Sequence, residues 1–240
     1  MRFEDQRVVI LGGTSGIGLA TAQAAAAEGA AVVVASSSAG RVEAALQQLP
    51  DTAEGRTVDL LDEAAIGDLF VEVGRFDHLV YTAGEALQLG MLADTRVAAA
   101  RAALDVRVWG AYAAVKHAAP QIRVGGSIVL SGGSAGAHPH PGWTVGALIC
   151  SGMEGLTRAL AVELAPLRVN LVRPGVVRTD LWRDMSEDDR STMYASVAEG
   201  LPVGRVGEAS DVAASFLYLM HNGYATGTIV TVDGGTLVAA

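Results

Sequence analysis

The stretch Val8-Val9-Ile10-Leu11-Gly12-Gly13-Thr14-Ser15-Gly16-Ile17-Gly18 decides the fold of this chain. Its four apolar residues predict a buried strand, and the glycines that follow let the backbone turn tightly and approach a ligand closely. An Ala-rich run over 19–27 then predicts a helix, whose first N–H groups and dipole favour an anion at the turn. A strand, a glycine-rich turn and a helix in this order predict a site for a pyrophosphate.

The composition is typical of one α/β domain with its own core. Of 240 residues, 50% are hydrophobic and 18% are charged, which excludes a disordered chain. A net charge of −9 argues against nucleic acid and anionic membranes as partners, because phosphate groups attract surplus Lys and Arg. Residues 1–7 lack a signal-peptide core, and no apolar run is long enough for a membrane span. The single cysteine, Cys150, excludes an internal disulfide and predicts a cytoplasmic location; no metal site is expected.

Short β-branched runs alternate with longer Ala- and Leu-rich helical patterns along the whole chain. Strands are expected near 8–11, 31–34, 56–58, 79–81, 127–131, 169–172 and 229–232, and helices near 16–27, 39–49, 63–73, 95–118, 145–164 and 210–220. This alternation predicts a single Rossmann-type domain, a doubly wound seven-stranded parallel sheet with helices on both faces. Its ligand should lie at the carboxyl ends of the strands. The polar stretch 178–203 is the least regular, and is either a cover over the cleft or a long surface connection.

Six motifs in order resemble those of the short-chain dehydrogenase/reductase family over essentially the whole chain. The glycine-rich turn is similar to the family's phosphate loop, although Leu11 stands where threonine is usual. Segment 59–60 resembles the one that meets the adenine ring, and segment 81–84 resembles the one that packs under the cofactor. Segment 173–179 resembles the turn that holds the nicotinamide amide. Segments 204–213 and 232–235 resemble the C-terminal signatures. The resemblance implies a nicotinamide cofactor contacted by Gly12, Thr14, Ser15, Gly16, Ile17, Gly18, Asp59, Leu60, Thr82, Ala83, Gly84, Pro174, Gly175, Val177 and Thr179.

Three serines, Ser36, Ser37 and Ser38, follow the second predicted strand. An NAD site usually places Asp or Glu here to bond the ribose 2′-hydroxyl, and that carboxylate would repel a 2′-phosphate. The serines, with Arg41 one turn further on, offer donors instead, which favours NADP(H) over NAD(H). Alternatively, they form a serine-rich turn with a helix N-cap, and the choice of cofactor stays open.

The family's proton-transfer residues are missing from the aligned positions. The resemblance implies a tyrosine acid, a lysine four residues later, a serine and an asparagine; the lysine tunes a phenol whose pKa is otherwise about 10. Residues 154–166 match the second half of the catalytic helix, and this register puts Gly146 at the tyrosine and Cys150 at the lysine. The serine position falls beside Ser134, and the asparagine position is Arg107. The chain is therefore expected to be an atypical member without the Tyr-x-x-x-Lys pair.

The catalytic residues stay unassigned, with four candidates. His138 and His140 follow the fifth predicted strand, and each is either a proton donor or an ordinary loop residue. Ser134 is a candidate for contact with a substrate carbonyl. Arg107 either supplies, towards the cofactor ribose, the positive charge that Cys150 lacks, or pairs with a carboxylate on a helix face.

Two functions are compatible with this pattern. The first is an NADP(H)-dependent oxidoreductase with a non-standard proton donor, acting on a small hydrophobic carbonyl or enone-type substrate; Trp143, Trp182 and Met185 suit an apolar wall. The alternative is a catalytically silent NADP(H)-binding module: a sensor, a partner subunit or a non-redox scaffold. The resemblance also implies a homodimer or homotetramer, through the 95–118 region and the apolar tail 236–240, although burial within the chain explains the same pattern.

Overall fold

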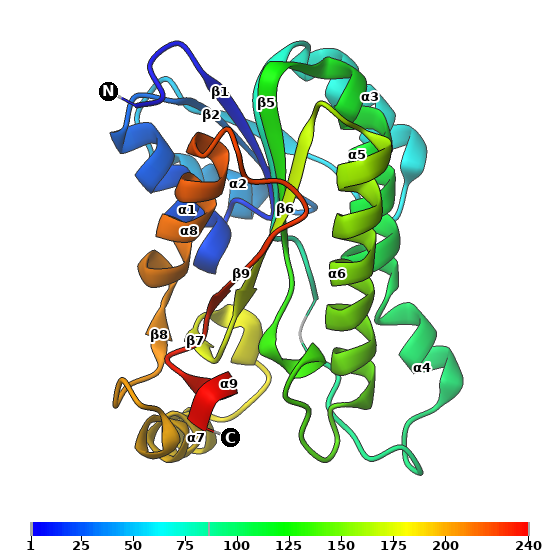
Figure 1. The fold of residues 1–240 in the computed structure, drawn as a ribbon, viewed down its shortest axis with the longest axis vertical. Helices are drawn as coiled ribbons and strands as arrows, with labels where there is room; N and C mark the ends of the chain where they lie inside the picture. The colour runs from blue at the N-terminus through cyan, green and yellow to red at the C-terminus, as the bar shows by residue number, and fades with distance from the viewer. Residues whose placement is uncertain (1, 86, 240) are drawn as a thin grey trace.

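A seven-stranded parallel sheet forms the centre of the molecule, as the sequence predicted (Figure 1). The computed structural model describes residues 2–85 and 87–239. The strand order is β3-β2-β1-β4-β5-β6-β9. The strands are β1 (Arg7–Leu11), β2 (Ala31–Ser36), β3 (Glu54–Thr57), β4 (Phe76–Tyr81), β5 (Ile122–Ser131), β6 (Arg168–Pro174) and β9 (Ile229–Val232). The chain moves outward from β1 in one direction and from β4 in the other, so a crevice opens beyond these two strands.

Helices cover both faces of the sheet. One face carries α1 (Gly16–Ala27), α2 (Ala39–Leu46) and α8 (Ala209–His221); the other carries α3 (Glu63–Val73), α5 (Ala111–Ala118) and α6 (Thr144–Glu163). By length and composition alone α6 could cross a membrane, but core helices pass the same test, and α6 packs on β5 and β6.

Alternation along β1 explains why its last four residues, Val8 to Leu11, are all apolar. Val8 and Ile10 point into the core beneath α1 and α8, whereas Val9 and Leu11 point into the core beneath α3 and α5. All four side chains are fully buried. Burial contributes about 1.5–3 kcal/mol for each such side chain, so a strand covered on both faces is strongly held in place.

The region predicted as one helix over 95–118 is divided in the structure. It contains α4 (Val97–Ala102), a π-helical turn at Asp105–Gly110, and α5. The Leu104 carbonyl accepts from both Val108 N–H and Trp109 N–H, and the buried Tyr81 hydroxyl donates to the Val106 carbonyl at 2.5 Å. These contacts widen the helix locally, which apolar periodicity alone does not reveal.

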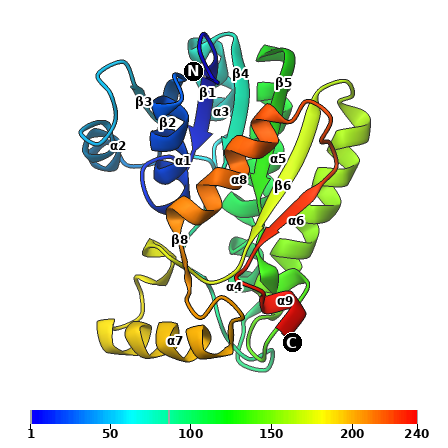
Figure 2. The same cartoon turned by 60° about the vertical axis from the view of Figure 1, so that its left-hand side comes forward.

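The stretch 178–203 is more regular than predicted. It begins with the second residue of the short strand β7 (Val177–Arg178) and continues with a short 3₁₀ turn and the helix α7 (Glu187–Gly200). Ser186 caps α7 by accepting from Asp189 N–H, and acidic residues fill the first turn. A second strand, β8 (Gly207–Glu208), pairs with β7. Figures 1 and 2 place α4, α7 and α9 (Thr236–Ala239) beyond the carboxyl ends of the strands; residue 240 of the predicted apolar tail lies outside the described residues.

Candidate functional site

A cavity of about 580 Å³ lies at the carboxyl ends of the parallel strands. Its walls are the segments that follow β1, β2, β3, β4, β5 and β6, together with one side of α6. This is the position that a doubly wound sheet prescribes for its ligand. All but one of the residues predicted to contact the cofactor line it: Gly12, Thr14, Ser15, Gly16, Ile17, Gly18, Ser36, Ser37, Asp59, Leu60, Thr82, Ala83, Gly84, Pro174, Gly175, Val177 and Thr179.

The glycine-rich turn leaves no room for side chains at two points. Gly12 has a φ of +85°, and a Cβ there would lie 2.5 Å from the Ala83 nitrogen. A Cβ at Gly18 would lie 2.1 Å from the Gly12 carbonyl oxygen and 2.5 Å from Thr82 Oγ1. Thr82 Oγ1 is also within hydrogen-bond distance of the Leu11 and Gly12 carbonyls, which ties the end of β4 to the turn. Glycine here keeps the turn, the helix and β4 packed closely around one wall of the cavity.

The first turn of α1 offers unpaired donors to the cavity. Ser15 is the N-cap, yet its side chain makes no capping bond, and no acidic residue occupies the first turn. The N–H groups of Gly16, Ile17 and Gly18 have no intrahelical acceptor, because they begin the helix. These donors and the helix dipole fit a pyrophosphate.

The end of the cavity beside β2 is lined by Ser36, Ser37 and Arg41. The Arg41 guanidinium lies 3.4 Å from Ser37 Oγ, and no ion pair to a described carboxylate involves it. Ser38, the remaining predicted contact, does not line the cavity; its side chain caps α2 by accepting from Arg41 N–H at 3.4 Å. The cavity lining also includes an acidic residue, Asp59, whose carboxylate accepts a hydrogen bond from the Leu61 N–H at 3.0 Å.

The opposite end of the cavity is lined by the residues at the positions where the sequence analysis expected the family's proton-transfer groups. Arg107, Ser134, Gly146 and Cys150 line it, whereas neither a tyrosine nor a lysine does so within the part of the chain that the structure describes. A Cβ at Gly146 would meet no atom within 4 Å, so the wall is open there. Burial raises the pKa of the Cys150 thiol, and the nearby positive charge of Arg107 only partly opposes this effect.

Arg107 crosses the space above Gly84. A Cβ at Gly84 would lie 2.5 Å from the Arg107 Cζ, and the guanidinium donates to the Glu85 carbonyl. The carboxylate pairing considered from the sequence is not observed: no ion pair joins Arg107 to an acidic side chain in residues 2–85 and 87–239. A contact with the cofactor ribose stays a prediction.

The two histidines lie outside the cavity lining in the described structure. The rings of His138 and His140 are 4.7 Å apart, His140 is 5.6 Å from the Trp143 ring, and Trp143 is 6.5 Å from the Trp182 ring. The two tryptophans line the cavity, and Met185 packs beside them. Thus the aromatic wall was anticipated, and the histidines sit at its outer end.

Several lining residues were not anticipated from the sequence. They are Leu61, Glu85, Leu87, Val106, Ile149, Asp180, Leu181 and Arg183 among others. Most of them adjoin a motif that was recognised, and their proximity to a strand end was the available signal. Among the described residues, no group of three or more His, Cys, Asp or Glu could hold a metal ion.

Comparison with known proteins places this geometry in a family. The family model described as an SDR-like Rossmann domain matches residues 2–239. The chain belongs to the short-chain dehydrogenase/reductase family. The short-chain dehydrogenase/reductase ATR9 of Stachybotrys chlorohalonatus is 38% identical over 97% of this chain and 97% of its own length. The short-chain dehydrogenase/reductase malC of Malbranchea aurantiaca is 32% identical over 97% of this chain and 95% of its own.

Two solved structures of the family extend the comparison. A small-chain dehydrogenase in complex with NADPH is 39% identical, with a TM-score of 0.87, and covers 98% of this chain and 100% of its own. The MalC reductase/Diels–Alderase of Malbranchea aurantiaca is 31% identical, with a TM-score of 0.91, over 99% and 98%. With the fit of the glycine-rich turn to a pyrophosphate, these matches identify an oxidoreductase of the short-chain dehydrogenase/reductase type that binds NAD(P).

Proposed function

We propose that this protein is an NADP(H)-dependent oxidoreductase that acts on a small hydrophobic carbonyl or enone-type substrate without the family's tyrosine acid. The observation that carries the proposal is one continuous cavity. It joins an anion-binding turn and a serine- and arginine-lined end to an aromatic wall around Arg107 and Cys150. When bound, the nicotinamide would donate or accept a hydride. The protein's contribution is to hold the two reacting carbons in register and to exclude water.

The preference for NADP(H) rests on the charges beside β2. Ser37 and Arg41 line this end of the cavity, and no acidic residue of β2 or the following turn does. A 2′-phosphate is a strong acceptor that suits hydroxyl donors and a guanidinium. The NADPH complex of the related small-chain dehydrogenase adds support.

The substrate class rests on the aromatic wall. Trp182 is 5% exposed and its Nε1 donates to the Val177 carbonyl at 3.0 Å, so the indole presents only its apolar ring to the cavity. Trp143, Ile149 and Leu181 line the same region. Apolar and aromatic walls favour hydrophobic ligands.

The test is binding followed by turnover. NADPH and NADH are titrated by fluorescence, and loss of the nicotinamide absorbance is then followed with panels of aldehydes, ketones, quinones and enones. Tight NADPH binding with turnover of a hydrophobic acceptor is expected. Binding without oxidation by any acceptor would contradict the reductase proposal.

A second candidate is an NADP(H)-binding module without redox turnover. Two observations favour it: the described cavity lining contains no tyrosine or lysine, and one related structure is named a reductase/Diels–Alderase. In this case the bound cofactor would shape a site for other chemistry. Acceleration of a cycloaddition by the NADP⁺-loaded protein, with no NADPH consumed, would distinguish this candidate from the first.

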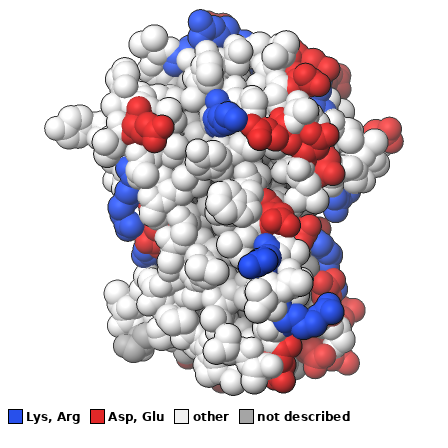
Figure 3. Space-filling view, turned by 90° about the vertical axis from the view of Figure 1, so that its right-hand side faces the viewer, with Lys and Arg blue, Asp and Glu red and all other residues white. Residues whose placement is uncertain are grey.

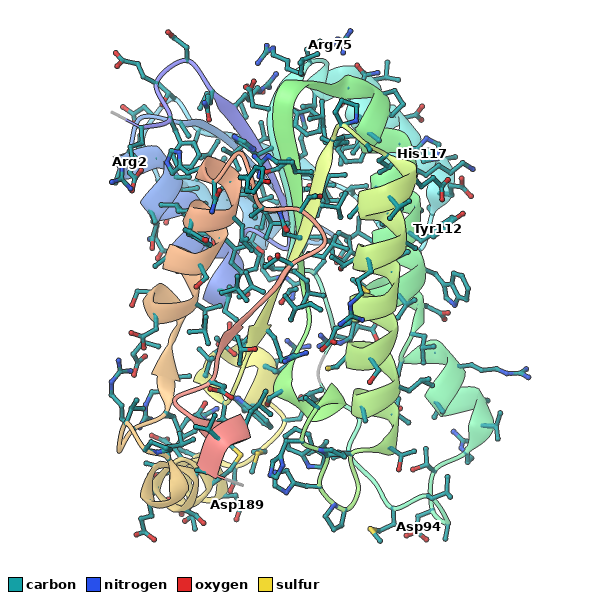
Figure 4. All side chains as sticks on the ribbon, in the orientation of Figure 1. Arg2, Arg75, Asp94, Tyr112, His117 and Asp189 are labelled. Carbon is teal, nitrogen blue, oxygen red and sulfur yellow. The ribbon has the colours of Figure 1, made fainter. Side chains whose placement is uncertain are left out.

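We further propose that the protein is a homodimer or homotetramer. Figure 3 shows an uncharged area over the middle of this face, with charged residues gathered at the top and along one side. Exposed apolar side chains from the π-helical turn, α5 and α6 include Trp109, Tyr112, Leu148 and Val162. Tyr112 projects outward from α5 in Figure 4. Light scattering of the wild type and Leu148→Arg tests this: an oligomer that dissociates in the variant is expected, and a monomeric wild type would contradict it.

A further inference from the structure

Arg107 is positioned by one contact to the backbone of its neighbour Val106 and by one contact of its own guanidinium. Tyr81, fully buried at the end of β4, donates to the Val106 carbonyl, and burial raises the pKa of Tyr81 so that its hydroxyl stays protonated. The π-helical turn places Arg107 on the cavity side, where its guanidinium lies against Gly84 and donates to the Glu85 carbonyl. The π-helical turn and the buried tyrosine therefore fix one cation at the reacting end of the site.

Arg107 lines the cavity and has more donors than its bond to Glu85 uses. A guanidinium has five N–H groups, and one nitrogen is bonded to the Glu85 carbonyl. Among the described residues no fully buried side-chain nitrogen or oxygen lacks a partner. Burial lowers the pKa of Arg107, and an arginine remains charged nonetheless.

The groups around Arg107 are a thiol, a hydroxyl, one further cation and one carboxylate. Cys150 faces it from α6, and the pKa of this thiol is raised by burial. Ser134 carries a hydroxyl, which is a poor acid, and Gly146 carries no group at all. Nearby, Arg183 is a second cation and the Glu85 carboxylate is an anion, and the two have opposite effects on the pKa of Arg107. The Arg107 guanidinium can stabilise an oxygen that becomes negative during reaction, whereas the family's tyrosine acid is absent from the described lining.

Building on the proposed function, we infer that Arg107 binds the carbonyl oxygen of a conjugated enone and stabilises the enolate formed by hydride addition to the β-carbon. The β-carbon gains the hydride, and the carbon–carbon π pair forms a new double bond between the α-carbon and the carbonyl carbon. The carbonyl π pair moves to the oxygen beside Arg107. Water then protonates the α-carbon, so that enone, NADPH and one proton give the saturated ketone and NADP⁺. A saturated ketone is a poor substrate, because its alkoxide needs a proton during the hydride transfer.

The experiment uses cyclohex-2-enone and cyclohexanone as substrates and 4-nitrophenol as a probe of the oxyanion site. Arg107→Met removes the charge at similar length, Arg107→Lys keeps it, and Arg101→Met on the exposed surface of α4 is the control. NADPH binding is measured by fluorescence in each protein. Binding of nitrophenolate is measured by its absorbance, with and without NADP⁺, because a phenolate is a planar anion that resembles the enolate.

The wild type should consume NADPH with the enone at least a hundredfold faster than with the saturated ketone. It should also lower the pKa of bound nitrophenol. Arg107→Met should lose about 10²–10³-fold in enone kcat and lose the nitrophenolate preference. Arg107→Lys should recover part of both, and Arg101→Met should behave as the wild type. Equal nitrophenolate binding by the wild type and Arg107→Met would overturn the role assigned to Arg107. Absence of NADPH binding in the wild type would overturn the proposed function, and nitrophenolate binding would then still test the role of Arg107.

Discussion

Gly18→Ala should damage the site more than any other single methyl group added to the glycine-rich turn. The new Cβ would lie 2.1 Å from the Gly12 carbonyl oxygen and 2.5 Å from Thr82 Oγ1. Neither atom can move alone, because Gly12 N–H donates to the Ala35 carbonyl and Thr82 Oγ1 is within hydrogen-bond distance of the Leu11 and Gly12 carbonyls. Relief of the clash must therefore displace the turn, the start of α1, or the end of β4.

The magnitude follows from this overpacking. Forcing a methyl group into a tightly packed position costs about 1–3 kcal/mol. In a chain of this size each kcal/mol lowers Tm by roughly 2–4 °C, so Gly18→Ala should lower Tm by roughly 2–12 °C. Displacement of the anion-binding N–H groups should also weaken NADPH binding at least tenfold, which corresponds to about 1.4 kcal/mol.

The assay is thermal unfolding combined with fluorescence titration of NADPH. Gly155→Ala is the matched control, since a Cβ there meets nothing within 4 Å on the exposed side of α6. That control should keep its NADPH affinity and gain up to about 1 kcal/mol, because alanine favours helix. Unchanged Tm and NADPH affinity in Gly18→Ala would show that the turn accommodates a methyl group at this position.

Three further predictions concern the cofactor, the catalytic helix and the core. Ser37→Asp should weaken NADPH binding at least tenfold and leave NADH binding unchanged or better, because the carboxylate repels the 2′-phosphate; fluorescence titration of both cofactors checks this, and an unchanged preference would refute it. Gly146→Tyr combined with Cys150→Lys should speed reduction of saturated ketones about a hundredfold by supplying the missing acid, and steady-state kinetics no faster than the wild type would show that the register is wrong. Burial lowers the pKa of His78 from 6.5 to about 4, so its stabilising effect is complete above pH 6.5 and is lost as the pH falls towards 4. This difference corresponds to about 3 kcal/mol, and urea unfolding of His78→Asn should vary less between pH 7 and 4.5 than that of the wild type; equal variation would contradict the assignment.

The sheet could be predicted because its strands are buried on both faces. Val8 to Leu11 are apolar at every position, and unbroken apolar runs also occur in β2 (31–35) and β5 (128–130). The glycine-rich turn was equally readable, because Gly12 and Gly18 occupy positions where a side chain is excluded by the backbone. Local constraints of this kind leave a direct record in the sequence.

The division of the 95–118 region could not be predicted in the same way. Its cause is a tertiary contact, the Tyr81 hydroxyl reaching the Val106 carbonyl from a different element. Helix α7 was missed for a different reason. Its sequence is polar on most sides, and only Tyr194 in it is buried, so apolar periodicity is nearly absent.

At the site, the sequence predicted which residues would gather but not their individual roles. Arg107 and Cys150 are 43 positions apart in the sequence, and their proximity depends on how the π-helical turn and α6 pack. The place of the two histidines also depends on tertiary structure. Their position after β5 was compatible with the cavity, whereas the loop carries His138 and His140 to the outer end of the aromatic wall.

The most direct test of hydride transfer without a tyrosine acid is the position of a label in the product. NADPH carrying deuterium at the transferred position of the nicotinamide is incubated with the wild-type protein and cyclohex-2-enone, and the product is analysed by NMR. Hydride addition to the β-carbon predicts cyclohexanone with a single deuterium on the former β-carbon. Deuterium on the carbinol carbon of an allylic alcohol, or unlabelled enone with NADPH bound but not consumed, would contradict it.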